Sequence, residues 1–408
     1  MFSLKTFTKK YFSKSRPIEV VIISGKRTPV GSFLGSLSEV KATSLGAIAI
    51  KGVISESGAL VDDIDEVIMG NVISAGLGQA PARQAALMGG LKEKTVCTTI
   101  NKVCSSGLKA VTLGASSILT GHSNNVIAGG FECMSLVPHY AQMRKQTQFG
   151  NSALICGIQL DGLTDAYDFI PMGLCAESTN KDFNITRTEQ DDYCELSYER
   201  ALKAIKDEIF AREIIPVEIA DKKGELITIS KDEEPTKFRK DKFRSLRPAF
   251  DKQGSITAAN SSKINDGGCA FYLSSSEYAK ARSLKPIARI IDYVDAETTP
   301  KKFSIAPSLA IQALLERTGK RVEDISCFEI NEAFASVVLA NMKLLKIPIS
   351  KMNLHGGAVA LGHPIGMSGA RILLSLLSCL KEINGQYGIA SVCNGGGGST
   401  AILIERLN

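Results

Sequence analysis

The strongest constraint on the fold is an alternation of short β-branched runs with stretches of helical periodicity, which occurs twice along the chain. In the first part we predict strands at 18–24, 67–71, 95–100 and 125–130, and helices at 44–57, 81–89 and 108–119. In the last third, 322–330 and 388–392 are strand-like, whereas 332–345 and 367–381 are helical. Such alternation predicts parallel sheet units. A duplicated βαβ unit would bring the glycines at 129–130 and 395–398 to one face, where such sheets bind ligands.

The middle of the chain has a different character. Residues 137–262 are richer in turns and charge, with a predicted helix at 188–211 and a basic loop at 237–247. A chain of 408 residues is long for a single core. We therefore interpret 137–262 as an inserted loop domain within an N-terminal half, 17–136, that is completed by 263–284. Residues 285–408 form the C-terminal half.

Residues 1–16 are basic, rich in hydroxyl groups and amphipathic, and no acidic residue occurs before Glu19. This composition is typical of a mitochondrial transit segment, although a disordered basic tail has the same composition. The segment predicts a location in the mitochondrial matrix, with the cytoplasm as the alternative.

The overall composition excludes several classes of protein. Apolar residues make up 44% of the chain and charged residues 22%, as in an ordinary globular protein. No stretch approaches the roughly 20 apolar residues that span a bilayer, so we expect no membrane partner. The net charge of +6 is mild and no basic and aromatic ribbon indicates nucleic acid. Ten cysteines without a CxxC pair indicate neither a zinc site nor a disulfide framework, and fit a reducing compartment.

Cys104 is the first candidate for chemistry, in the run Asn101-Lys102-Val103-Cys104-Ser105-Ser106-Gly107 between a predicted strand and a predicted helix. Ser105 and Ser106 are expected to cap the helix. The positive helix end would stabilise a thiolate, the form of cysteine that attacks carbonyl carbon. The alternative is a buried, inert thiol.

His363 and Cys393 are the next candidates. Gly362 and Pro364 hold His363 on a turn before a helix, where an imidazole with a pKa near ~6.5 could take a thiol proton. A turn histidine that caps a helix is the alternative. Cys393 ends a predicted strand and precedes four glycines, which let backbone N–H groups approach a ligand. A nucleotide-binding loop would need the GK[ST] motif, which is missing.

Four blocks together resemble the active-site motifs of the thiolase family: Asn-Lys-Val-Cys-Ser-Ser-Gly (101–107), Asn-Glu-Ala-Phe (331–334), Gly-Gly-Ala-Val-Ala-Leu-Gly-His-Pro-Ile-Gly (356–366) and Cys-Asn-Gly-Gly-Gly-Gly (393–398). The resemblance runs from about 18 to 407 and is strongest to the mitochondrial, biosynthetic branch. It implies an α/β fold of two duplicated βαβ halves, packed as a five-layer αβαβα core with an inserted loop domain. It also implies acetyl-CoA C-acetyltransferase activity, the reversible condensation of two acetyl-CoA to acetoacetyl-CoA and CoA, in lipid and ketone-body metabolism.

The resemblance also implies a role for each matching residue. Cys104 would carry the acetyl group in a ping-pong mechanism, and His363 would deprotonate it. The His363 ring and a water held by Asn331 would form one oxyanion site, and the backbone N–H groups of Cys104 and Gly395 the other. Cys393 would move the proton at the substrate α-carbon.

Further implied sites concern coenzyme A, a cation and assembly. Ser262 would contact the pantetheine arm, Met172 and Phe334 would line the acyl pocket, and Lys242 of the basic loop would meet the adenine and phosphate end. No cofactor is required, although a potassium ion would be held by the positions Tyr198, Ala258, Ala259 and Val359. The family suggests a homotetramer built as a dimer of dimers.

Three alternative functions are possible, and two of them predict a different set of residues at the site. A 3-ketoacyl-CoA thiolase of broader chain length, acting in fatty-acid β-oxidation, would share all these blocks. A ketoacyl synthase would use one cysteine with two histidines. A catalytically silent relative would be expected to lack Cys104, His363 or Cys393. His355 stands where the family usually carries asparagine, and could offer a second base.

Overall fold

The structure, a computed structural model, describes residues 18–144, 149–220 and 223–407. The predicted transit segment, 1–16, lies outside the described residues. Within these ranges, no helix combines the length and the apolar character that crossing a membrane requires.

The elements follow the alternation expected from the sequence. The first half contains β1 (Val20–Arg27), β2 (Gly31–Ser32), α1 (Ala42–Ser57), β3 (Glu66–Gly70), α2 (Pro81–Met88), β4 (Val96–Ile100), α3 (Ser106–Leu119), β5 (Asn125–Cys133), β10 (Asn265–Ser275) and α6 (Ser276–Ala281). The second half contains β11 (Ala288–Glu297), α7 (Ala306–Thr318), β12 (Cys327–Ile330), α8 (Ala335–Leu345), α9 (Ala358–Leu361), α10 (Ile365–Glu382), β13 (Tyr387–Asn394) and β14 (Gly398–Arg406).

The strand order shows the duplication. Outward from the contact between β1 and β11, one half runs β1-β10-β5-β3-β4 and the other runs β11-β14-β13-β12. The pairing directions repeat as well, because β5 and β13 are antiparallel to β10 and β14 but parallel to β3 and β12. Strand β1 pairs antiparallel with β11, Val20 opposite Ile290, so the two halves share one continuous sheet. Sequence reasoning predicted neither this pairing nor β14.

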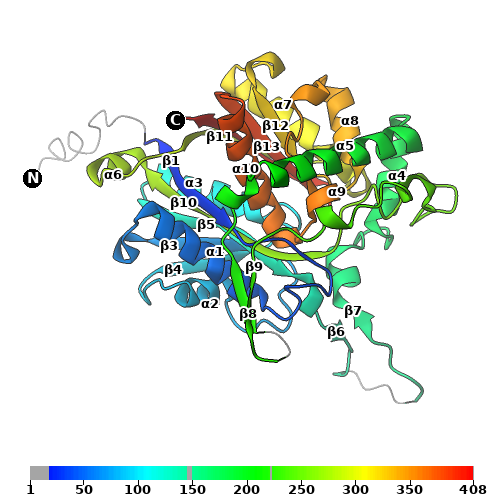
Figure 1. Cartoon of the computed structure of the whole chain (residues 1–408), viewed down its shortest axis with the longest axis horizontal. Helices are drawn as coiled ribbons and strands as arrows, with labels where there is room; N and C mark the ends of the chain where they lie inside the picture. The colour runs from blue at the N-terminus through cyan, green and yellow to red at the C-terminus, as the bar shows by residue number, and fades with distance from the viewer. Residues whose placement is uncertain (1–17, 145–148, 221–222, 408) are drawn as a thin grey trace, which may run out of the picture.

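The helices form three layers around the two halves of the sheet (Figure 1). Helices α3 and α10 contact each other in the middle, where their apolar side chains share one core with the inner faces of the strands. Helices α1 and α2 cover the outer face of the first half, and α7 and α8 cover that of the second. The predicted five-layer αβαβα core is confirmed.

Glycines let the two central helices begin close together. A Cβ on Gly130 would lie 2.0 Å from the carbonyl oxygen of Gly366, and one on Gly107 would lie 2.8 Å from the backbone nitrogen of Ala370. Only a residue without a side chain permits this approach. Because Cys104 precedes α3 and His363 precedes α10, the same contact brings these two turns together.

The segment between β5 and β10 adds small elements around this core: β6 (His139–Tyr140), β7 (Ile155–Cys156), α4 (Met172–Asp182), α5 (Arg187–Lys206), β8 (Val217–Ala220) and β9 (Leu226–Ile229). Helix α5 begins with a capping box, in which Thr186 and Glu189 satisfy each other's backbone N–H groups. It packs on α8 and α9, so the insertion touches the second half directly. The domain boundaries that we infer from the sequence stay a prediction.

Candidate active site

The turn that carries Cys104 lies between β4 and α3 and is tied by its own polar groups. The backbone N–H of Lys102 donates to Ser106 Oγ at 2.8 Å, and Val103 has a positive φ of 47°. Ser105 Oγ lies 2.7 Å from Asn394 Oδ1, which fastens the turn to the end of β13. The prediction that Ser105 and Ser106 cap α3 is therefore wrong, because both hydroxyls serve the turn and β13 instead.

The thiol of Cys104 is protonated at rest. Burial raises the pKa of Cys104 to about 12, although the backbone N–H groups of Gly395 and of Cys104 itself lower it. The expected stabilised thiolate is wrong for the resting protein, since desolvation disfavours the charged form more than these donors favour it. A base must therefore remove the proton, and the two N–H groups already face the sulfur.

His363 is held so that one ring nitrogen, Nε2, is unprotonated. Its backbone N–H donates to Asn265 Oδ1 at 2.9 Å, and its Nδ1 lies 2.6 Å from Ser368 Oγ. Because the Ser368 hydroxyl donates to the carbonyl oxygen of Pro364, it accepts from Nδ1–H, which leaves Nε2 unprotonated and able to accept from Asn331 Nδ2. Burial and the nearby Arg371 lower the pKa of His363 to about 3, so the ring is a neutral base.

Asn331 and Cys393 lie next to these groups. Asn331 Nδ2 is 3.4 Å from His363 Nε2. Asn331 directly follows β12, and α8 begins only at Ala335. Cys393 is buried near the end of β13, and burial together with the nearby Cys104 raises its pKa well above the ordinary value. The thiols of Cys104 and Cys393 are thus neighbours, and the contact between α3 and α10 brings the turn of His363 toward the turn of Cys104.

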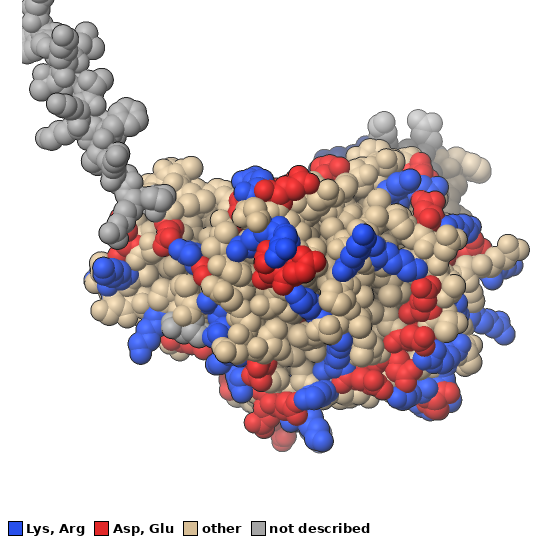
Figure 2. All heavy atoms as spheres, turned by 90° about the horizontal axis from the view of Figure 1, so that it is seen from above, with Lys and Arg blue, Asp and Glu red and all other residues tan. Residues whose placement is uncertain are grey.

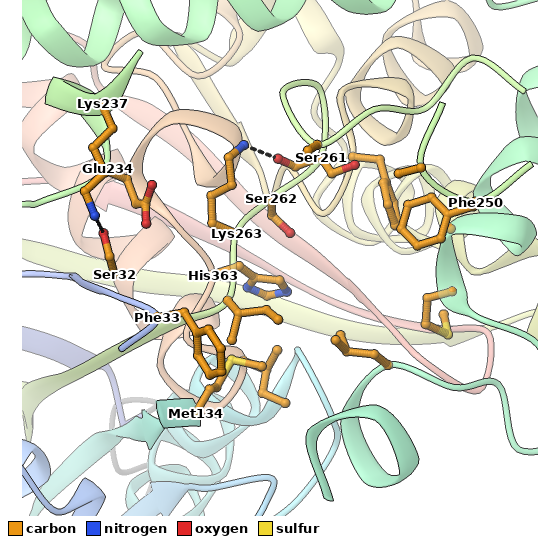
Figure 3. Close-up of a pocket in the computed structure, with 18 residues that line it drawn as sticks. Ser32, Phe33, Met134, Glu234, Lys237, Phe250, Ser261, Ser262, Lys263 and His363 are labelled. Atoms are coloured by element: carbon orange, nitrogen blue, oxygen red, sulfur yellow. Dashed lines mark hydrogen bonds between the residues drawn. The ribbon is translucent and has the colours of Figure 1, made fainter. Parts of the chain in front are cut away.

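A cavity of about 540 Å³ opens beside this site and is lined by His363, Ser262, Met172 and Phe334, four of the residues chosen from the sequence. In Figure 3, His363 and Ser262 face the same space, and Phe250 closes another side. Phe334 packs edge-on against Phe250 and Phe303, with ring centroids 6.0 and 6.4 Å apart. The wall beyond His363 is therefore aromatic and closely packed.

The basic loop contributes only part of what was expected. Lys237 lines the cavity, whereas Lys242 is exposed and does not. Two other cations of the loop, Lys240 and Arg244, pair with Glu195 of α5. Figure 2 shows blue and red side chains intermixed on the displayed face. Among the described residues, Lys242 takes part in no ion pair, so its role at the phosphate end stays a proposal.

The positions expected to hold potassium lie together but do not fit the ion. Lys263 Nζ donates to the carbonyl oxygens of Ala259 and Val359, at 3.2 Å each, and lies 5.8 Å from the centre of the Tyr198 ring. An ammonium group thus already binds the carbonyl oxygens at two of the four positions that the resemblance assigns to the ion. No cluster of three His, Cys, Asp or Glu side chains suited to a metal occurs in the described ranges either.

Sequence reasoning missed the residues that position the candidate catalytic groups. Besides Ser368 and Asn265, these include Glu132, whose buried carboxylate accepts from the backbone N–H groups of Val72, Ile73 and Gly366. Burial raises the pKa of Glu132 to about 7, against the pull of these donors. Gly366 lies in the first turn of α10, so the carboxylate fixes the helix that follows His363.

His355 does not line the cavity that His363 lines. It is buried, and its ring lies edge-on to Phe210 with centroids 6.3 Å apart. Burial also lowers its pKa.

Comparison with known families covers nearly the whole chain. A family model described as "Thiolase, N-terminal domain" matches residues 20–277, and one described as "Thiolase, C-terminal domain" matches residues 284–406.

Individual relatives are similar over their full length. A "Probable acetyl-CoA acetyltransferase" from Dictyostelium discoideum is 50% identical, over 99% of this chain and 98% of that protein. "Acetyl-CoA acetyltransferase, mitochondrial" from Mus musculus is 48% identical over 99% and 95%, and "Acetyl-CoA acetyltransferase ERG10, cytosolic" from Gibberella zeae is 46% identical over 95% and 98%. The Acat5 thiolase from Ascaris suum, solved in complex with coenzyme A, superposes with a TM-score of 0.90 at 42% identity, over 95% and 100%.

Proposed function

The chain belongs to the thiolase family and is an acyltransferase, and we propose that it catalyses the reversible condensation of two acetyl-CoA to acetoacetyl-CoA and CoA. One observation carries the proposal: the Cys104 thiol faces the backbone N–H groups of Gly395 and of Cys104 itself and lies near Cys393, on a turn whose helix, α3, contacts the helix that follows His363.

In the first half-reaction, His363 Nε2 takes the proton of the Cys104 thiol as the sulfur attacks the carbonyl carbon of acetyl-CoA. Burial disfavours both charged forms, so the pair stays neutral until the substrate carbonyl can accept the charge. The negative oxygen is stabilised by the N–H groups of Gly395 and Cys104, and one such preorganised donor contributes ~3 kcal/mol. The leaving CoA thiolate takes the proton of Cys393, which leaves acetyl-Cys104 and a Cys393 thiolate.

In the second half-reaction, the Cys393 thiolate removes a proton from the α-carbon of a second acetyl-CoA. The enolate oxygen is stabilised by the Nε2–H of the His363 imidazolium and by a water on Asn331. The α-carbon then attacks the acetyl group on Cys104, and the departing sulfur takes its proton back from His363. Every proton is returned, and no cofactor is needed.

Coenzyme A enters this scheme as substrate and product. We propose that its pantetheine arm runs along Ser262 and that Lys242 and Lys237 meet its phosphates, since Ser262 and Lys237 line the cavity. The Ascaris relative that was solved with coenzyme A supports binding in this fold.

A thiolase for longer 3-ketoacyl-CoA substrates is the competing function. The aromatic packing of Phe334 against Phe250 and Phe303 supports a short acyl group, because a long chain would have to separate these rings. Comparing kcat/KM for thiolysis of acetoacetyl-CoA and of 3-ketooctanoyl-CoA tests this. We expect a clear preference for acetoacetyl-CoA, and an equal or higher value for the longer substrate would contradict it.

Location and assembly are also proposals. Residues 1–16 support the mitochondrial matrix, as does the name of the mouse relative, whereas the Gibberella relative is named cytosolic. A fluorescent fusion of the whole chain, compared with one lacking 1–16, separates the two. We propose a homotetramer, which light scattering on the purified protein tests.

A further inference from the structure

The cradle of carbonyl oxygens around Lys263 resembles a binding site for a monovalent cation. The ammonium donates to the carbonyl oxygens of Ser261 at 2.6 Å and of Ala259 and Val359 at 3.2 Å each. The bond to Ser261 is drawn in Figure 3. An ammonium has three N–H donors and no acceptor, so this arrangement satisfies all of them.

Backbone carbonyls, rather than carboxylates, hold this charge. Among the described residues, no acidic side chain lies within ion-pair distance of Lys263, although Glu234 and Glu332 are close enough to raise its pKa. Burial is the larger effect and lowers the pKa of Lys263 to about 8, so the group is still mostly protonated at neutral pH. Rings of carbonyl oxygens around a bare positive charge are how proteins coordinate potassium.

The three carbonyls come from two separate parts of the chain. Ala259 and Ser261 precede Ser262, which lines the cavity, and Val359 lies on α9, just before the turn of His363. Glu332, next to Asn331, accepts from the backbone N–H of the same Val359 at 3.0 Å. The cation therefore joins the loop that carries Ser262 to the loops of Asn331 and His363.

We propose that the ammonium of Lys263 takes the place of a potassium ion in this protein, so that a side chain supplies permanently the charge that orders the Ser262 loop. It is a positioning residue, since the bonds of its ammonium go to backbone carbonyls. The proposal predicts that turnover and stability do not depend on potassium.

The test compares the wild type with three variants in equal concentrations of potassium, sodium or tetramethylammonium chloride. Lys263→Ala empties the cradle, whereas Lys263→Met removes the charge but keeps the cradle filled. Lys351→Ala is the matched control, because Lys351 also donates to backbone carbonyls, those of Glu323 and Ile325, but does not line the cavity. Thermal midpoints are measured without substrate, and KM for CoA and kcat are measured in thiolysis.

We expect the wild-type midpoint to agree within about 1 °C in all three salts. In sodium, Lys263→Ala should raise KM for CoA about tenfold with kcat nearly unchanged, the loss expected for one charge-assisted hydrogen bond. Potassium should restore this variant but not Lys263→Met, and Lys351→Ala should show no change in KM.

A wild type that potassium stabilises or activates over sodium would overturn the proposal, even if no variant can be purified. Equal responses of Lys263→Ala and Lys263→Met to potassium would overturn it too, as would an unchanged KM in Lys263→Ala. The kinetic readout rests on the proposed function, whereas the midpoints do not, so the two can fail separately.

Discussion

Replacing Ser368 with alanine removes the partner of His363 Nδ1 without touching the nitrogen that meets the substrate. The hydroxyl lies 2.6 Å from Nδ1 and holds the ring in the tautomer whose Nε2 can accept a proton. A hydrogen bond to a group that becomes charged contributes about 1.5–3 kcal/mol. Because ~1.4 kcal/mol corresponds to a factor of ten, kcat/KM should fall roughly 10- to 150-fold.

The chain offers a matched control on the same helix. Ser375 is also buried on α10, and its hydroxyl has no hydrogen-bond partner among the described residues. Ser375→Ala should keep both activity and thermal midpoint. The assay is thiolysis of acetoacetyl-CoA together with the rate of Cys104 acetylation, which should fall in parallel in Ser368→Ala. Activity of Ser368→Ala within twofold of the wild type, or an equal loss in Ser375→Ala, would refute the assigned tautomer.

Three other predictions address the remaining groups. Cys393→Ser should slow condensation at least ~100-fold more than it slows acetylation of the enzyme, because a hydroxyl is a poor base at carbon; equal losses, measured in separate half-reaction assays, would contradict its role. Gly362→Ala should lower the free energy of unfolding in urea by about 1–3 kcal/mol, since φ at this position is 98° and the new Cβ would lie 2.4 Å from Asn265 Oδ1. Gly58 also has a positive φ, but its new Cβ would meet no atom within 4 Å, so Gly58→Ala should lose stability without loss of activity. Burial lowers the pKa of His363 to about 3, and only a protonated ring would be disabled as a base. The acetylation rate should therefore not decline through His363 between about pH 8 and 5. A fall of this rate on the acid side of pH ~6.5, in the wild type and in Ser375→Ala alike, would argue against a neutral buried ring.

Local patterns predicted many of the core elements, but not β10, β11, α7 or β14. The helix predicted at 108–119 is α3, and that at 367–381 lies within α10, because each has a continuous apolar pattern between clear turns. The strand predicted at 322–330 was only partly correct, since the strand is β12 (Cys327–Ile330) and a short 3-10 turn precedes it.

The errors arose where distant parts of the chain meet. Nothing near Ser105 in sequence indicates that its hydroxyl bonds to Asn394, and nothing near Cys104 indicates that its surroundings raise the pKa of the thiol. The same holds for Lys263, because its carbonyl partners Ala259 and Val359 are about a hundred residues apart in the sequence. Pairings of this kind are set by the close approach of the two halves, which a local pattern does not contain.

The central claim is that Cys104 carries the acetyl group, and mass spectrometry of peptides from enzyme quenched after mixing with isotopically labelled acetyl-CoA tests it most directly. The account predicts one labelled acetyl per chain, on the peptide that contains Cys104, and none in Cys104→Ser, which should also lose turnover. Label on Cys393 or another residue, or turnover that persists in Cys104→Ser, would contradict it.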